Sequence, residues 1–302
     1  MPYQIILSTD PGIDDALAII FLSKLKVLKA IWTTVGNNTL EVCTHNAMKL
    51  LELLGRKEIP IIKGAAQSLS LNLDFIAEVH GKDGLGNTFL PLPDASSFIW
   101  KNLDYIISIL EENPGEITIV SIGPLTNLAI LLQKASKKTL NSIKEIIIMG
   151  GAVNVPGNVT PYAEFNIYSD PKAAKLVLTS KLPMILVGLD ITHKVILTEA
   201  HIQVIEAKRS PLNEFIAKMS RYYLKFHKRI QGGYLHDPLA AAVAIDPSLI
   251  TTQDFFIDVI LDDPLKFGQT YPTKSREAPV ISVGVDVNSE KFLNFFMNTL
   301  LK

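Results

Sequence analysis

The sequence has 302 residues, of which 48% are hydrophobic and 20% are charged, so it supplies a full apolar core and is not that of a disordered chain. Lysine and arginine number 29 against 30 aspartates and glutamates, for a net charge of −1. The basic excess typical of proteins that bind polymeric nucleic acid or anionic membranes is absent, so we expect neither partner.

The single cysteine, Cys43, excludes an intrachain disulfide, and we interpret it as a buried apolar residue. This usage is typical of a reducing compartment, and the N-terminus lacks the basic region of a signal peptide. No apolar run approaches the ~18 residues of a membrane-spanning helix. Together these features predict a cytoplasmic protein.

Short apolar runs alternate with longer amphipathic stretches through the first two thirds of the chain. The runs predict strands at residues 5–7, 30–35, 60–63, 116–122, 143–149 and 183–187. Helices are predicted between them, at residues that include 16–22, 39–54 and 125–132. Strands that are apolar on both faces and separated by helices indicate an α/β fold with a mostly parallel, open central sheet flanked by helices.

The last third of the chain is less regular. It predicts helices at residues 199–209, 213–230, 238–245 and 289–301, and strands at residues 255–261 and 280–286. Residues 66–97 form the longest stretch without a clear pattern, and long loops in compact domains are often functional. Because the chain has no repeat, linker or low-complexity tract, we expect residues 1–302 to form one domain.

Three carboxylates follow the first predicted strand directly. Asp10 lies at the strand end, while Asp14 and Asp15 lie at the start of the next helix, where negative charge is favoured. Helix capping and solvation explain Asp14 and Asp15, but they do not explain Asp10. Ligands bind at the carboxyl ends of strands in open parallel sheets, so Asp10 is expected to face a crevice.

A hard divalent cation would neutralise this acidic cluster. Carboxylates this close raise one another's pKa values unless a cation intervenes, and their oxygens suit calcium or magnesium. No cysteine or histidine accompanies the cluster, which disfavours zinc. The Gly-rich spacing of a dinucleotide site and a P-loop are both absent here. Gly12 stands where an aspartyl phosphatase would place its second acid.

Polar residues follow other predicted strands. Asn37 comes after the second strand, although a turn role explains it equally well. Ile122 ends another strand, where a freed backbone carbonyl can ligate a hard cation. Further along, Asn158, Glu164 and Asn166 offer the donors and acceptors that would grip the vicinal hydroxyls of a sugar.

We expect residues 158–166 to form a loop. In an extended chain Glu164 and Asn166 share one face, and Phe165 points the other way and packs.

Two histidines are candidates for contact with a ligand. His236 precedes Asp237, which with the following proline could simply cap a helix, and the imidazole is a candidate proton donor near neutral pH. His80 lies in the long unassigned stretch beside a glycine, where it could close over a ligand.

Taken in order, these motifs resemble the nucleoside hydrolase family of inosine–uridine preferring enzymes over nearly the whole chain. The family signature Asp-x-Asp-Pro-Gly-x-Asp-Asp is matched by residues 8–15 (STDPGIDD). Further matches are residues 34–37 (TVGN), 123–127 (GPLTN), 149–151 (MGG), 163–166 (AEFN) and 236–238 (HDP). Each motif alone is weak, but their order and spacing together are specific.

The resemblance implies calcium-dependent hydrolysis of the N-glycosidic bond of ribonucleosides. It implies a Ca²⁺ ion held by Asp10, Asp15, Asp237 and the main-chain carbonyl of Ile122. Asp10 would accept a proton from a calcium-bound water that attacks C1′, and His236 would protonate the departing base. Ribose or base contacts are implied for Asp14, Asn37, His80, Asn158, Glu164, Phe165 and Asn166.

Two details bear on affinity and specificity. Ser8 replaces the usual first acid of the signature, which puts metal affinity in doubt. The presence of both His80 and His236 resembles pyrimidine-preferring or broad-specificity members, so pyrimidine nucleosides are expected, with purine nucleosides as further candidates. Tyr222, Tyr223 and His227 lie on a predicted helix that borders the base or is an amphipathic surface helix.

Two alternative functions have the same fold. A non-catalytic nucleoside- or ribose-binding protein would not need Asp10 as a base. A metal-dependent phosphatase would need basic residues around the acids, and these motifs contain none. The family resemblance also suggests a homodimer or homotetramer and a role in nucleoside salvage.

Overall fold

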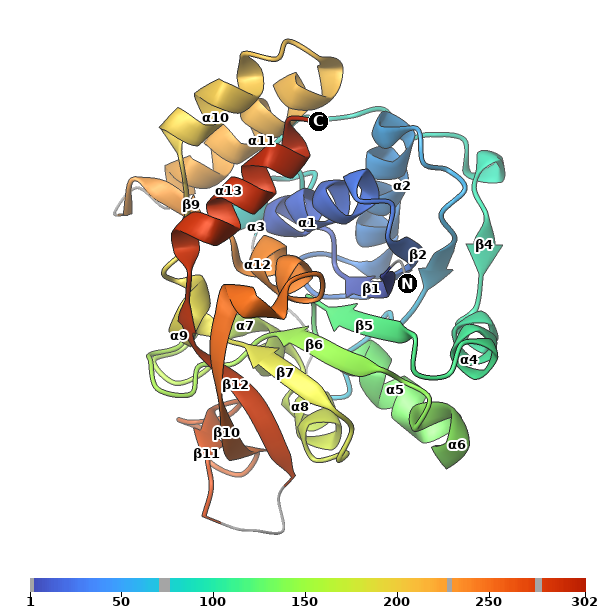
Figure 1. Ribbon diagram of the computed structural model, residues 1–302, viewed down its shortest axis with the longest axis vertical. Helices are drawn as coiled ribbons and strands as arrows, with labels where there is room; N and C mark the ends of the chain where they lie inside the picture. Colours follow the sequence, from blue (N-terminus) through green and yellow to red (C-terminus); the bar gives the residue numbers. More distant parts are fainter. Residues whose placement is uncertain (1–2, 71–76, 227–229, 275–278) are drawn as a thin grey trace.

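The protein is described here by a computed structural model that covers residues 3–70, 77–226, 230–274 and 279–302. A ten-stranded sheet runs through it in the order β11-β10-β12-β7-β6-β5-β1-β2-β3-β4 (Figure 1). The strands are β1 Gln4–Thr9, β2 Leu28–Thr33, β3 Ile61–Lys63, β4 Trp100–Lys101, β5 Ile117–Ser121, β6 Glu145–Met149, β7 Met184–Val187, β10 Ile250–Val259, β11 Thr270–Pro272 and β12 Val280–Val287. Neighbours from β12 to β4 pair in parallel, whereas β10 pairs antiparallel with both β12 and β11. The predicted α/β fold with a mostly parallel sheet is confirmed.

The order of the strands places a switch point beside β1. From β1 the chain proceeds outward through β2, β3 and β4, and it then returns to β5 on the other side of β1. The connections that leave β1 and β5 therefore part in opposite directions, which opens a crevice at their carboxyl ends. Asp10 follows β1 and Ile122 follows β5, so both lie at this crevice.

Helices cover both faces of the sheet because the strands are apolar on both faces. In β1, Ile5 and Leu7 belong to one apolar core and Ile6 to the other. The first core includes α1 (Ile13–Lys24), α2 (Leu40–Leu54), α10 (Glu199–Glu206), α11 (Pro211–Phe226), α12 (His236–Val243) and α13 (Ser289–Leu300). The second includes α4 (Leu103–Glu112), α5 (Thr126–Lys134) and α8 (Pro171–Leu178).

The remaining elements are short. They are the helices α3 (Ala77–His80), α6 (Lys137–Leu140), α7 (Phe165–Ser169) and α9 (Leu189–Thr192), the 3-10 turns η1 (Ala95–Ser97) and η3 (Pro247–Leu249), and an antiparallel pair formed by β8 (Ile196–Thr198) and β9 (Gly232–Tyr234). No helix among the described residues combines the length and apolar character needed to cross a membrane.

Two expectations about local structure are corrected. Phe165 and Asn166 do not lie in an extended loop, because Glu164 caps a short helix, α7, that begins at Phe165. Strand β10 begins at Ile250, five residues earlier than the expected 255. Its first half is largely exposed and pairs with β12, so it lacks the apolar residues by which buried strands are recognised.

Candidate active site

The acidic segment that follows β1 is fully enclosed by the fold. Asp10 and Asp15 have no solvent exposure, and Asp14 is 7% exposed. Asp14 and Asp15 lie in the first turn of α1, as expected. Burial of three carboxylates within six residues is costly unless each finds donors or a cation.

The two carboxylate oxygens of Asp10 have different surroundings. Oδ2 accepts a hydrogen bond from the backbone N–H of Asn37 at 2.6 Å. Oδ1 is buried and has no hydrogen-bond partner among the described residues. A Cβ atom on Gly36 or Gly123 would overlap this carboxylate, so glycine is required at both positions for the backbone to approach it.

Asp15 organises the backbone of the same segment. Its Oδ2 accepts from the Gly12 N–H at 3.0 Å, which caps α1, and from Asn37 Nδ2 at 3.0 Å. Its Oδ1 accepts from the Thr9 hydroxyl and from the Asp10 N–H at 3.2 Å. The interpretation of Asp14 as the helix cap and of Asp15 as solvated is therefore wrong, because Asp15 is buried and caps α1. Asn37 lies beside the acidic segment, as expected.

The carboxylates of Asp14, Asp15 and Asp237 lie together, with one oxygen of each within 4.8 Å of the others. Burial raises the pKa of Asp237 well above its usual range, and the charges of Asp14 and Asp15 add to this shift. The pKa of Asp14 is raised to about 8, mainly by burial and next by the charge of Asp15. Burial, followed by Asp15, also raises the pKa of Asp10.

This donor set fits a hard divalent cation. Every candidate ligand is an oxygen, the carboxylates repel one another, and Asp10 Oδ1 lacks a protein donor in the described part of the chain. The group of three contains Asp15 and Asp237, two of the expected ligands, and Asp14, which was expected at the ribose. Ile122 lines the same cavity, and its carbonyl accepts from Asn166 Nδ2 at 3.0 Å. A carbonyl has two lone pairs, so this bond leaves room for a further interaction.

The opposite wall is built at the N-terminus of α7. Glu164 Oε1 accepts from the Asn166 N–H at 2.9 Å, and Oε2 accepts from Gly151 N–H at 2.9 Å and Ile167 N–H at 3.1 Å. Asn166 Nδ2 also donates to the Met149 carbonyl, which ties α7 to the end of β6. Asn158 Oδ1 accepts from the Phe165 N–H at 2.9 Å. Backbone donors therefore hold Glu164 in place, a role that the sequence did not indicate.

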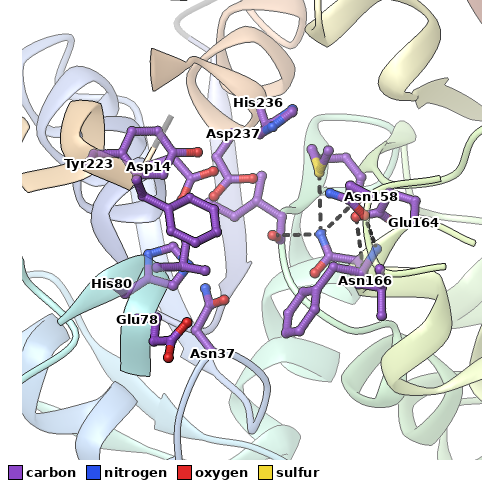
Figure 2. A pocket seen from close by; sticks show the side chains of 16 residues that line it. Asp14, Asn37, Glu78, His80, Asn158, Glu164, Asn166, Tyr223, His236 and Asp237 are labelled. Carbon is purple, nitrogen blue, oxygen red and sulfur yellow. Dashed lines mark hydrogen bonds between the residues drawn. The ribbon is translucent and has the colours of Figure 1, made fainter. Parts of the chain in front are cut away.

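Both candidate histidines line the cavity, one from α12 and one from α3 (Figure 2). His236 is 8% exposed, and its Nδ1 lies 2.7 Å from the hydroxyl of Thr192. His80 Nδ1 accepts the backbone N–H of Ile13 at 3.1 Å, so the proton of a neutral ring lies on Nε2. The ring of His80 stacks on Tyr223 with centroids 6.2 Å apart.

These walls enclose a cavity of about 350 Å³, within the usual range for small-molecule sites. Asp10 and Asp15 lie beneath its surface, and the expected residues that line it are Asp14, Asn37, His80, Ile122, Asn158, Glu164, Phe165, Asn166, His236 and Asp237. The close-up shows Asp14 of α1 and Asp237 of α12 on one side of the cavity and the polar residues at and before the start of α7 on the other (Figure 2).

Some lining residues had no earlier assignment. Glu78, Val79, Val159 and Phe226 line the cavity without having been predicted. Of the aromatic residues on α11, Tyr223 lines it, whereas Tyr222 donates to the Glu78 carbonyl and His227 lies outside the described residues. Phe226 follows Tyr223 by three positions on the helix, a spacing that could have identified it.

Comparison with known proteins identifies the family. The model of the inosine-uridine preferring nucleoside hydrolase family matches residues 5–294. The pyrimidine-specific ribonucleoside hydrolase RihA of Escherichia coli O1:K1 is 36% identical over 313 residues, which cover 99% of each chain. RihA of Salmonella gallinarum is 35% identical over 309 residues, again with 99% of each covered.

Solved structures agree. The plant nucleoside hydrolase PpNRh1 matches with a TM-score of 0.93 and 37% identity, over 100% of this chain and 99% of that one. A purine-preferring ribonucleoside hydrolase from Gardnerella vaginalis also matches with a TM-score of 0.93, at 30% identity, over 99% of this chain and 98% of that one. Over its whole length, this α/β fold thus has close structural counterparts among nucleoside hydrolases. The chain belongs to the inosine-uridine preferring nucleoside hydrolase family, and the resemblance seen in its motifs is confirmed.

Proposed function

We propose that the protein hydrolyses the N-glycosidic bond of pyrimidine ribonucleosides, with purine ribonucleosides as further candidate substrates, and that it requires Ca²⁺. The observation that carries this proposal is the buried carboxylate cluster at one wall of a nucleoside-sized cavity. Cleavage of an N-glycosidic bond passes through an oxocarbenium-like state with positive charge on the sugar. Carboxylates placed beforehand around that charge stabilise it as it forms.

Asp10, Asp15, Asp237 and the carbonyl of Ile122 would hold the cation. When bound, a divalent cation of this kind activates and orients a water molecule and offsets the repulsion among the acids. Asp10 is the proposed general base, because its Oδ1 has no donor in the described part of the chain and can take the proton of the attacking water. The bond from that water to C1′ forms as the C1′–N bond breaks, so the configuration at C1′ inverts.

The opposite wall would hold the ribose. We assign hydroxyl contacts to Asp14, Asn158, Glu164 and Asn166, with Asn37 supporting the acidic segment and Phe165 packing on the sugar. Support comes from the backbone bonds that fix Glu164 and Asn158, since a side chain held in this way is already oriented for a ligand.

The departing base receives the electron pair of the broken bond. We propose that His236 donates a proton to it, and that His80, at the end of α3, lies over the base. The contact of His236 Nδ1 with Thr192 supports this role, because it fixes the orientation of a ring that lines the cavity.

Ribose release is the direct test. The purified protein, with CaCl₂ present, should release reducing sugar from uridine and cytidine, and at a lower rate from inosine. No release from any of the three would contradict the hydrolase proposal, and nucleoside binding without turnover, measured by calorimetry, would favour the alternative of a non-catalytic binder. We also expect a cytoplasmic homodimer or homotetramer, whose size sedimentation analysis would establish.

A further inference from the structure

Asn46 is a fully buried residue of α2 that does not line the cavity. Its Nδ2 donates to two carbonyl groups, those of Pro11 at 3.2 Å and Asp83 at 2.9 Å. Pro11 belongs to the acidic segment, residues 10–15, and Asp83 belongs to residues 80–89, which we call the His80 loop. One amide nitrogen therefore joins the two segments that carry the acids and one of the histidines.

The His80 loop is folded around its own carboxylate. Asp83 accepts hydrogen bonds from the backbone N–H groups of Leu85 at 2.9 Å, Asn87 at 2.8 Å and Phe89 at 2.7 Å. Gly86 N–H donates to the His80 carbonyl at 2.8 Å. A loop with this many internal bonds keeps its shape, so its contacts with the rest of the protein decide where His80 lies.

Two such contacts reach the acidic segment. Asn46 links Asp83 to Pro11, and the imidazole Nδ1 of His80 accepts the N–H of Ile13. Two attachment points fix an orientation as well as a distance. The Ile13 contact also selects the tautomer, because Nδ1 can accept only when the ring proton is on Nε2.

We propose that Asn46 is a positioning residue that holds the His80 loop against the N-terminus of α1, and thereby fixes His80 as the Nε2–H tautomer at the base end of the cavity. The expected effect on turnover rests on the proposed function, whereas the tautomer itself does not. Loss of the amide removes the link to Pro11, so that among the described residues the Ile13 bond is the hydrogen bond that remains between the His80 loop and the acidic segment.

A double-mutant cycle tests the effect on turnover. Asn46→Leu keeps the branching of the side chain and removes both donated hydrogen bonds, and we expect kcat/KM for uridine to fall about tenfold. In the His80→Ala background the same change should cost little, because it acts through His80. Thr44→Val, which also removes buried hydrogen bonds from α2, is the matched control and should leave kcat/KM unchanged. An equal fractional loss in both backgrounds would overturn the proposal.

A spectroscopic measurement is independent of hydrolysis. In histidine-selective ¹⁵N-labelled protein, the His80 ring, assigned with His80→Asn, should show a protonated Nε2 and an unprotonated Nδ1. Asn46→Leu, or Asn46→Ser if the first variant does not fold, should give a mixture of tautomers. An unchanged ring signal in a folded Asn46 variant would refute the positioning role. If the parent protein releases no ribose, the proposed function fails and the ring signal alone decides the role of Asn46.

Discussion

Asp10 is fully buried, and its two carboxylate oxygens differ in their hydrogen bonding. One is held by the Asn37 N–H, while the other has no donor among the described residues. Leaving a buried acceptor unpaired costs about 1–3 kcal/mol, and more when it is charged. Glycines at positions 36 and 123 keep the backbone close on both sides, so the residue cannot relieve this cost by moving. A cation and a reacting water would provide what the protein itself does not.

The Asn substitution at this position tests the proposed base, together with its contribution to the cation site. Asp10→Asn keeps the shape of the side chain, so the fold should survive while kcat for uridine falls by roughly 10²–10⁴-fold, the usual contribution of a general base. Circular dichroism would verify the fold and a ribose-release assay the rate. Rates close to those of the parent protein would rule out Asp10 as the base.

Substrates with different leaving groups test whether His236 donates a proton to the departing base. We expect His236→Ala to lower kcat/KM for uridine by about 10²-fold or more, because a base anion leaves poorly without a proton. The same variant should lose far less on p-nitrophenyl riboside, since p-nitrophenolate needs no proton to leave. Similar losses on both substrates would show that His236 acts by binding or structure instead.

The sequence predicts the acids of the site better than their partners. Asp10, Asp15 and Asp237 follow from motifs at element boundaries. The capping role of Glu164 and the bridging role of Asn46 depend on backbone groups far away in the chain, at Gly151 and at Asp83. A single buried amide has no periodic signal, so no local pattern could identify it.

At the scale of elements, helix N-termini form much of the site. Helices α1, α7 and α12 all begin beside the cavity, and their first residues are Ile13, Phe165 and His236. Asp15 and Glu164 cap the first two through backbone N–H groups. Acidic caps are stabilised by the helix dipole, so the same contacts that begin these helices also fix the carboxylates of the site.

Elements with continuous apolar character were the easiest to predict. Strands β5 and β6 lie within the expected ranges because they are buried on both faces. Helix α7 was missed because five residues are too few to show a helical period. Helix α4 also had no prediction, although Ile106, Ile109 and Leu110 carry the spacing of a buried helix face.

Asp170 shows how one helix cap also anchors a loop. It accepts from the Ala173 N–H as the cap of α8, and from Leu69 N–H, the Ser70 hydroxyl and the Thr126 hydroxyl. From the sequence, Asp170 followed by Pro171 indicates only a helix cap.

Asp170→Ala should lower the free energy of unfolding by about 2–4 kcal/mol, because it removes a cap and leaves buried donors unpaired. Urea unfolding would measure this loss. Ser136→Ala, which removes the cap of α6, is the control and should cost about 1 kcal/mol. A loss in Asp170→Ala no larger than in the control would show that the loop contacts contribute nothing.

At the scale of the whole molecule, we propose that residues 1–302 form one domain. The ten-stranded sheet takes strands from residue 4 to residue 287, and β1 lies near its middle. Cutting the chain between its halves would therefore divide one sheet and one pair of apolar cores.

The buried acids also make stability depend on pH and on metal. The pKa of Asp14 rises from 3.8 to about 8 on folding without a cation. Between pH 3.8 and about pH 8, the folded state keeps a proton that the unfolded chain has lost. The stability of the metal-free protein therefore falls as the pH rises through this range. Asp10 and Asp237 shift in the same direction. A bound cation replaces these protons, so the stabilisation that the cation provides should increase with pH.

Melting temperatures in EDTA and in CaCl₂ would check this dependence. From about pH 5 to pH 8, the difference between the two conditions should widen by at least about 3 °C, an amount that corresponds to roughly 1 kcal/mol. Asp14→Asn should reduce the widening. A difference that stays constant with pH would contradict the linkage.

The signs of the charges around the cavity determine which metabolites can enter it. Among its described lining residues, Asp14, Glu78, Glu164 and Asp237 are acidic, and none is lysine or arginine. With Asp237 assigned to the cation, a 5′-phosphate, which carries about −1.5 to −2 charges near pH 7, would still meet Asp14, Glu78 and Glu164 without a basic side chain as partner. We therefore expect nucleotides to be excluded, so that a dephosphorylation reaction must precede this one. Electrostatic repulsion alone would then protect nucleotides from hydrolysis, and no separate group would be needed to distinguish them from nucleosides.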